Sequence, residues 1–145
     1  MAISSHGLAK IQGSEANALL KWKASFDNQS KALLSSWNIS NKPCNWVGIT
    51  CDDESKSIYE VNLANIGVKD RIGVMSNLNT LDLSLNNLSG SIPNSVGNLS
   101  KLSHLDLSSN YFTGIIPSEI TQLVGLYVLL IGRNNDLSGS LPQEI

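Results

Sequence analysis

LNTLDLSLNNLSGSIPNSVGNLSK, residues 78–101, is followed by LSHLDLSSNYFTGIIPSEITQLVG, residues 102–125, and then by LYVLLIGRNNDLSGSLPQEI, residues 126–145. The three segments are copies of one pattern with a period of 24 residues. Self-similarity at this period predicts a solenoid, in which each copy is one turn built from a strand and a return segment. Because a turn can bury its apolar face only against its neighbours, the copies also predict one continuous core.

The residue types within each copy match the predicted path of the chain. Leucine or isoleucine at the first, fourth and sixth positions is expected to point into the core, while the residues between them alternate outward. An asparagine follows, whose amide can hydrogen-bond the backbone of neighbouring turns. Glycine permits a bend on the far side, and proline fixes φ where the return segment begins. These positions are Asn86, Asn110 and Asn134, then Gly90, Gly114 and Gly139, then Pro93, Pro117 and Pro142.

The repeats contain two irregularities. An earlier strand is predicted at SIYEVNL, yet only 20 residues separate its Ile58 from Leu78, so the first turn is expected to be shortened. Asp70 stands where the later copies have glycine. In the last copy one residue is inserted, and we expect the insertion within residues 134–136, just after the strand.

The segment before the repeats is predicted to be helical. Ser14 offers an N-cap with Glu15 in the first turn, and apolar residues at helical spacing predict a helix over residues 15–26. Ser30 is expected to cap a second short helix. The predicted organisation is a disordered N-terminus at 1–13, a helical cap at 14–56, and repeats at 57–145. The repeats comprise a short irregular first one, two full ones and a partial one.

Composition narrows the classes of function. The 145 residues have a formal net charge of −2, which argues against binding to duplex nucleic acid. The longest apolar stretch, residues 124–131, is too short to span a bilayer. No catalytic or metal-binding constellation is recognisable, so we expect no enzyme activity, no cofactor and no metal.

Two features concern the cellular compartment. Residues 1–13 lack the basic start and the apolar stretch of a secretory signal. Four N-x-S/T sequons nevertheless indicate an extracellular, glycosylated chain, with acceptors at Asn28, Asn38, Asn87 and Asn98. Our interpretation is that Met1 is an internal methionine and that a signal peptide lies upstream.

Cys44 and Cys51 bound the short segment CNWVGITC. Such a pair could form a metal site, a redox pair or a structural disulfide. A zinc site would need two further ligands, and none is close in the sequence.

EANALLKWKASFDNQSKALLSSW, CNWVGITC and the LDLSxNxLSGSIP copies together resemble the N-terminal ectodomain of plant leucine-rich-repeat receptor-like kinases. The resemblance covers residues 14–145, and L-x-G-x-I-P is characteristic of the plant repeat subclass. It implies an α/β solenoid, a leucine-rich-repeat right-handed superhelix with a helical N-terminal cap and a second short parallel sheet. It also implies that Cys44 and Cys51 form a disulfide in the cap.

For function, the resemblance implies recognition. Receptors of this kind bind a peptide or a partner ectodomain, such as a co-receptor, on the inner face of the solenoid, outside the plasma membrane. The family signals through a serine/threonine kinase domain, whose Gly-rich, H-R-D and D-F-G elements are absent from these residues. We expect the transmembrane helix of the family to be missing too, and no contact of this fragment with membrane or nucleic acid. The alternatives are a free-standing short leucine-rich-repeat protein, co-receptor-like or inhibitory, and a non-functional truncated gene product.

The outward strand positions predict the binding surface on the concave sheet. An acid–base role for His104 and Asp106 is disfavoured, because an open sheet provides neither a third group nor an enclosed pocket. Val128 and Leu130 make one end of the surface apolar, with Arg133 beside them, which indicates either a ligand patch or a surface that a further repeat covers. The predicted binding residues are Glu60, Asp82, His104, Asp106, Val128, Leu130 and Arg133.

Three tryptophans allow two interpretations. Trp22, Trp37 and Trp46 could form a carbohydrate-stacking set, or they could pack the cap over the first repeat. We favour packing, because the end of a solenoid must be covered.

Overall fold

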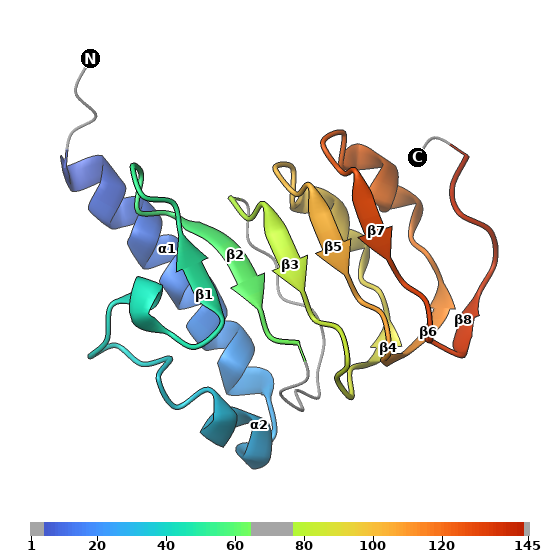
Figure 1. The fold of residues 1–145 in the computed structure, drawn as a ribbon, viewed down its shortest axis with the longest axis horizontal. Coiled ribbons are helices and arrows are strands. Elements are labelled where there is room, and N and C mark those ends of the chain that lie inside the picture. The colour runs from blue at the N-terminus through green and yellow to red at the C-terminus, as the bar shows by residue number, and fades with distance from the viewer. Residues whose placement is uncertain (1–4, 65–76, 144–145) are drawn as a thin grey trace.

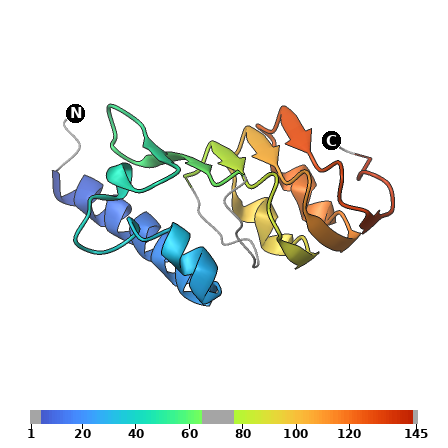
Figure 2. The same cartoon turned by 60° about the horizontal axis from the view of Figure 1, so that its bottom comes forward.

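The computed structural model describes residues 5–64 and 77–143 as a solenoid with a helical cap at its N-terminal end (Figure 1). One sheet has the strand order β1-β2-β3-β5-β7 and a second sheet the order β4-β6-β8. The first comprises β1 (Ile49–Cys51), β2 (Ile58–Asn62), β3 (Thr80–Asp82), β5 (His104–Asp106) and β7 (Val128–Leu130). The second comprises β4 (Ser89–Ser91), β6 (Tyr111–Ile115) and β8 (Asp136–Ser138). Figure 2 shows the 3-10 helices η2 (Asn94–Asn98) and η3 (Ser118–Gln122) beneath the first sheet.

The 24-residue period becomes a parallel register in the first sheet. Thr80 pairs with His104, and His104 pairs with Val128. The strand predicted within SIYEVNL is confirmed as β2, whose Glu60 pairs with Thr80 across the shortened first turn. β1 adds an antiparallel strand in front of β2, which the sequence did not indicate. The predicted departure at Asp70 lies outside the described residues.

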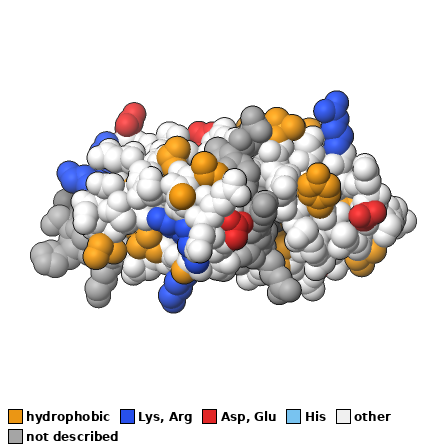
Figure 3. All heavy atoms as spheres, turned by 90° about the horizontal axis from the view of Figure 1, so that it is seen from below, with side chains coloured by type: hydrophobic (Ala, Val, Ile, Leu, Met, Phe, Trp, Pro, Cys, Tyr) orange, Lys and Arg blue, Asp and Glu red, His pale blue; other side chains and the backbone are white. Residues whose placement is uncertain are grey.

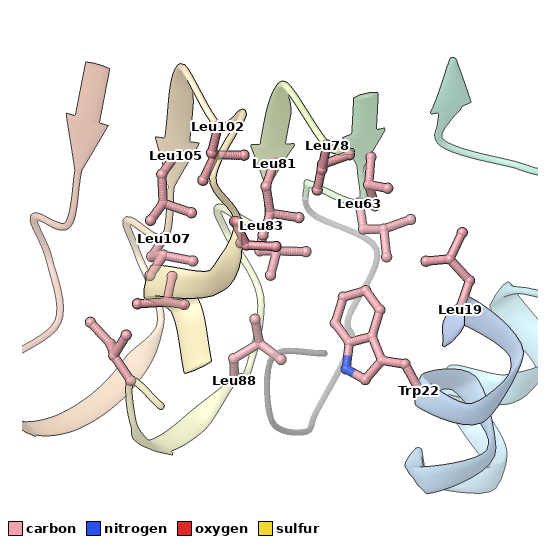
Figure 4. Packing of buried hydrophobic residues seen from close by; sticks show 14 of the residues in the cluster. Leu19, Trp22, Leu63, Leu78, Leu81, Leu83, Leu88, Leu102, Leu105 and Leu107 are labelled. Carbon is pink, nitrogen blue, oxygen red and sulfur yellow. The ribbon is translucent and has the colours of Figure 1, made fainter. Parts of the chain in front are cut away.

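The inward leucines form one continuous core. Figure 4 shows leucines of successive turns stacked behind the first sheet, with Leu19 and Trp22 projecting from the cap toward them. Burying a leucine side chain contributes about 1.5–3 kcal/mol, so the stack is the main source of stability. The leucines of the repeats that are at most 1% exposed are Leu63, Leu78, Leu81, Leu83, Leu88, Leu99, Leu102, Leu105 and Leu107.

The predicted role of the asparagines is confirmed. The Asn110 side chain is 4% exposed, and its Nδ2 donates to the Leu83 carbonyl of the preceding turn at 2.8 Å. Its Oδ1 accepts the backbone N–H of Leu88, also in the preceding turn, at 3.0 Å. Asn86 and Asn134 likewise donate to a carbonyl of the turn before them. The ladder satisfies backbone groups that the curved chain buries between the two sheets.

The far side of each turn also follows the prediction. η2 and η3 begin directly after Pro93 and Pro117, whose φ values are −74° and −64°. All three glycines at the predicted bends have positive φ, as Gly90, Gly114 and Gly139 at 82°, 78° and 83°.

The inserted residue is visible in the second sheet. Ser89 pairs with Tyr111, an offset of 22 residues, whereas Thr113 pairs with Asp136, an offset of 23. Asn134 remains buried in its ladder position, so the extra residue lies between Asn134 and Asp136. The predicted location of the insertion is confirmed.

The first cap helix begins earlier than predicted. α1 spans Ser5–Ser25, so the expectation of disorder over residues 1–13 is wrong for residues 5–13. Residues 8–12 are mostly good helix formers, and their propensity extends the helix although they carry no periodic apolar face. Ser14 and Glu15 therefore lie inside the helix. Within the described ranges, no helix is both long and apolar enough to cross a membrane.

Glu15 has a role that the sequence did not reveal. Its side chain is only 5% exposed, and its Oε2 accepts the backbone N–H of Ile58 in β2 at 2.9 Å. Its Oε1 accepts a hydrogen bond from Nδ2 of Asn77 at 2.7 Å. One carboxylate thus connects α1 to the first strand of the repeats and to the segment before β3.

The second cap helix has a different N-cap from the one predicted. α2 spans Asn28–Leu33, and Asp27 caps it by accepting the backbone N–H groups of Gln29 and Ser30 at 2.8 and 3.0 Å. Ser30 lies within the helix and is fully buried. Aspartate and serine are both good N-caps, and here the Asp27 carboxylate also accepts a hydrogen bond from the Ser30 hydroxyl.

The disulfide and the packing role of the tryptophans are confirmed. Cys44, in the 3-10 helix η1 (Pro43–Asn45), is bonded to Cys51 in β1 with a Cα–Cα distance of 5.5 Å. Trp37 stacks on Trp46 with ring centroids 5.6 Å apart, and Trp22 lies 6.4 Å from Trp37. All three indoles are at most 6% exposed, so none offers an open stacking platform for a sugar.

Replacing both Cys44 and Cys51 by serine is expected to lower the free energy of unfolding by about 2.5 kcal/mol, because the bond closes a short loop and removes little unfolded-state entropy. Urea unfolding followed by circular dichroism measures the change. Reduced wild-type protein is the control and should lose the same amount. A double variant with an unchanged midpoint and slope would show that the loop is held by packing alone.

Candidate binding surface

The outward residues of the first sheet lie in two rows across the strands. The first row is Glu60, Thr80, His104 and Val128, and the second is Asn62, Asp82, Asp106 and Leu130. The predicted residues are therefore brought together on neighbouring strands, and Arg133 follows β7 at the end of the second row. Glu60, Asp82, His104, Asp106 and Val128 are half-buried, whereas Leu130 and Arg133 are exposed.

Two of these carboxylates have a structural role that the sequence analysis missed. Oδ1 of Asp82 accepts the backbone N–H of Ser84 at 2.9 Å, and Oδ1 of Asp106 accepts that of Ser108 at 2.9 Å. Each bond caps the end of its strand, which explains why aspartate recurs in the L-D-L pattern. In β7 the equivalent residue is Leu130, so the last strand carries an apolar side chain where β3 and β5 carry a capping carboxylate.

A hollow of about 430 Å³ lies where the second row ends. Asp106, Leu130 and Arg133 line it together with residues that the prediction did not include, namely Ser84, Leu85, Ser108, Ser109 and Gly132. Arg133 also borders a second hollow of about 520 Å³, whose lining includes Tyr111 and Asp136. The arginine therefore stands between two open depressions that a ligand could occupy.

The backbone places Arg133 in this position. Leu85, Ser109 and Arg133 occupy equivalent places in successive turns, and their φ values are 56°, 56° and 58°. A non-glycine residue with positive φ is uncommon and turns its side chain out of the strand direction. The repeat thus turns one side chain per turn outward beside the first sheet, exposed at Leu85 and Arg133 and half-buried at Ser109, a feature that the residue types alone do not indicate.

His104 and Asp106 are outward on one strand, and the part of the chain that is described contains no group of three or more His, Cys, Asp or Glu side chains able to hold a metal. Hydrogen bonds from the backbone N–H and the hydroxyl of Ser55 lower the pKa of Asp52. Asp52 lies in the turn between β1 and β2, away from both hollows.

The sequons lie off the first sheet. Asn87 precedes β4 and Asn98 ends η2, and both side chains are exposed. Asn28 begins α2, where the sequon hydroxyl of Ser30 is fully buried. Asn38 is half-buried and its amide hydrogen-bonds the surrounding turn. The face on the side of α2 and the second sheet shows small, scattered groups of apolar and charged side chains among its described residues (Figure 3).

Comparison with known protein families shows to which family the chain belongs. A leucine-rich-repeat N-terminal domain matches residues 12–52, and leucine-rich repeats match residues 77–99 and 101–123. The chain belongs to the leucine-rich-repeat family. Together with the plant relatives described next, these matches confirm the resemblance to plant leucine-rich-repeat receptor kinases and the solenoid fold class.

Two curated relatives of this leucine-rich-repeat protein come from Arabidopsis thaliana. It is 46% identical over 90 residues to a probable leucine-rich repeat receptor-like protein kinase, covering 54% of this chain and 8% of the relative. It is 42% identical over 87 residues to MDIS1-interacting receptor like kinase 2, again covering 54% and 8%. The chain thus spans less than a tenth of the length of these relatives.

Solved structures of similar size show the same fold. A chain of the BIR3–SERK2 complex from Arabidopsis thaliana matches with a TM-score of 0.69 and 28% identity, covering 88% of this chain and 85% of that chain. The BIR2 ectodomain from the same plant matches with a TM-score of 0.58 and 25% identity, covering 88% and 83%.

Proposed function

We propose that this protein is the extracellular recognition module of a plant receptor-like kinase and that it binds a peptide or a partner ectodomain on its first sheet. The observation that carries the proposal is the hollow beside Arg133. There an exposed apolar side chain, Leu130, and the carboxylate of Asp106 adjoin an exposed cation on an open parallel sheet. A ligand laid across the strands touches several turns at once, and aligned rows offer it repeated contacts.

Solved relatives support this choice of partner class. The BIR3–SERK2 structure is a complex of two proteins, and RGFR1 is described as a plant peptide hormone receptor in complex with RGF2. RGFR1 matches this chain with a TM-score of 0.53 and 30% identity, over 70% of this chain and 19% of that chain. Both partner classes, a second ectodomain and a secreted peptide, suit the mixed apolar and charged surface around Arg133.

A second candidate is a free-standing short recognition protein, co-receptor-like or inhibitory. The sizes of two solved structures favour it. The match to this protein covers 83% of the BIR2 chain and 85% of the chain from the BIR3–SERK2 complex, so solved solenoids of this family are of nearly this size. The two candidates use the same sheet and differ in whether the partner or this chain carries the signal across the membrane.

The proposed location is the extracellular face of the plasma membrane, as in membrane receptor kinases. There the exposed sequons at Asn87 and Asn98 are better glycan acceptors than Asn28 and Asn38, and glycans on them leave the first sheet clear. The relatives are kinases, and we place any kinase activity outside these residues, because the first sheet offers a binding surface without an enclosed acid–base site.

Charge reversal on the first sheet tests the proposal. Immobilised wild-type protein is probed by interferometry with the BIR3 ectodomain, the SERK2 ectodomain and the RGF2 peptide. For whichever of these binds, Leu130→Glu and Arg133→Glu are each expected to weaken binding about tenfold or more, because both side chains line the hollow.

Matched controls separate the surface from general effects of charge. Val124→Glu places the same acid at another exposed apolar residue, 92% exposed and off the first sheet. Lys101→Glu reverses an exposed cation away from the hollow. If the controls weaken binding as much as the two sheet variants do, the first sheet is not the recognition surface.

A further inference from the structure

β7 differs from the strands before it in the residues that it turns outward on the first sheet. At the paired positions, β2, β3 and β5 carry polar side chains, whereas β7 carries Val128 and Leu130. Leu130 is 45% exposed, and Tyr127, directly before the strand, is 77% exposed. Side chains of a strand point to the two faces of its sheet, so Val128 and Leu130 stay open whichever strand lies beside β7. Contiguous apolar exposure next to polar residues marks an interaction surface.

The hollow of about 430 Å³ beside Arg133 combines this apolar exposure with a cation. Leu130 lines it from β7, and Leu85, which is 54% exposed, lines it from an earlier turn. Its volume lies within the range of small-ligand sites. Arg133 and Asp106 are the charged residues of its lining. The hollow therefore offers two leucines to an apolar side chain of a ligand, next to a charged rim.

Within the described ranges, the guanidinium of Arg133 has no ion-pair partner. Asp106 and Asp136 border the hollows on its two sides, but neither carboxylate forms an ion pair with it. Asp106 uses its Oδ1 to accept the backbone N–H of Ser108. A guanidinium presents five N–H donors in a planar fork that fits a carboxylate. Arg133 is thus available to a carboxylate from another molecule.

The surrounding charges select the kind of anion and its position. Glu60, Asp82 and Asp106 stand on β2, β3 and β5, and these three strands contain no lysine or arginine. Neighbouring strands are about 4.8 Å apart, so an anion over β5 is repelled by Asp106, whereas an anion beside the end of β7 meets Arg133. A singly charged carboxylate is balanced there by one cation, whereas a doubly charged phosphate also faces Asp106 and Asp136. The anion that suits this site is therefore a carboxylate.

We propose that the hollow beside Arg133 binds a peptide in which an aliphatic residue and an aspartate or glutamate stand two positions apart. In an extended peptide such residues project to the same side about 6.6 Å apart. The aliphatic side chain then lies between Leu85 and Leu130, and the carboxylate pairs with Arg133. A hollow of this size admits single side chains, which favours a peptide over a folded ectodomain. The inference rests on the recognition function proposed above and names the ligand chemistry of that surface.

Amidated pentapeptides test the proposal, because the side-chain carboxylate is their only charge. Acetyl-Gly-Leu-Ser-Asp-Gly-amide and its reverse, acetyl-Gly-Asp-Ser-Leu-Gly-amide, cover both chain directions. Each is titrated into ¹⁵N-labelled protein while the backbone N–H resonances of Leu130, Gly132 and Arg133 are followed by NMR. We expect at least one of them to bind with millimolar affinity. Its analogues with asparagine for aspartate, or with serine for leucine, should bind at least about fivefold more weakly.

A charge exchange isolates the pair with Arg133. Arg133→Glu is expected to bind the aspartate peptide at least about fivefold more weakly and to prefer the analogue with lysine in place of aspartate. Lys101→Glu reverses an exposed cation away from the hollow and should bind both peptides as wild type does. Leu130→Ser should weaken binding of the aspartate peptide, whereas Val124→Ser, at an exposed apolar residue off the first sheet, should not.

The proposal is overturned if neither aspartate peptide binds, or if Arg133→Glu leaves the preference between aspartate and lysine unchanged. Binding of acetyl-Gly-Leu-Ser-Asn with a free C-terminal carboxylate, without binding of the amidated peptides, would also overturn it, in favour of a chain terminus. These outcomes leave the recognition surface intact as long as Leu130→Glu and Arg133→Glu weaken binding of BIR3, SERK2 or the RGF2 peptide. If those two variants change none of these three interactions, the recognition surface itself fails.

Discussion

Replacing Asn110 by aspartate is expected to lower the free energy of unfolding by about 4 kcal/mol, the range for an uncompensated buried charge. The side chain is 4% exposed, and its Nδ2 lies 2.8 Å from the Leu83 carbonyl and 3.2 Å from the Leu107 carbonyl. An aspartate keeps an acceptor for the Leu88 N–H but turns the donated bonds, including one to the Ser108 carbonyl, into contacts between oxygen atoms. Urea unfolding monitored by circular dichroism measures the loss.

An exposed asparagine in the preceding turn offers a matched control for this change. Asn87→Asp makes the same substitution at an exposed asparagine, and it should alter the free energy of unfolding by no more than about 0.5 kcal/mol. Asn110→Leu, which removes the bonds without adding charge, should fall between the two. If Asn110→Asp unfolds at the same urea concentration as Asn87→Asp, the ladder does not stabilise the solenoid.

Local repetition explains which parts of the fold could be predicted. The parallel strands of the first sheet, the asparagine ladder, the bends and the inserted residue all depend on contacts between neighbouring turns, so the 24-residue period reveals them, whereas the antiparallel β1 lies outside the repeat. Glu15 could not be assigned in this way. Its partners Ile58 and Asn77 are 43 and 62 residues away, and nothing in the helix sequence indicates which strand it will meet.

The candidate binding surface likewise has a part that the sequence predicts and a part that it does not. The two outward rows of the first sheet follow from alternation along the strands, so Asp82, Asp106 and Leu130 were placed correctly. The hollow itself was not predictable, because it depends on the positive φ of Ser109 and Arg133.

Gly48→Ala is expected to lower the free energy of unfolding by about 3 kcal/mol or more, since it combines backbone strain with a clash against fixed atoms. Gly48 has a φ of 71°, and an added Cβ would lie only 2.8 Å from Cδ2 of Leu63 and closer still to the Asn62 carbonyl oxygen. The same region holds the hydrogen bond from the Asn62 N–H to the Gly48 carbonyl at 2.7 Å. The clash therefore separates β1, with the disulfide, from the first strand of the repeats. Thermal and urea unfolding measure the effect.

Two other glycines turn this prediction into a graded series. Gly90 has a φ of 82° but open space around it, so Gly90→Ala isolates the backbone strain and should cost about 1–2 kcal/mol. Gly132 has open space and no positive φ, so Gly132→Ala should be neutral or stabilising by up to about 1 kcal/mol. The order expected is therefore Gly132, Gly90, Gly48, from least to most damaging. If Gly48→Ala costs no more than Gly90→Ala, the close approach of β1 to Asn62 relaxes freely, and the cap is joined to the repeats mainly through Glu15 and the core.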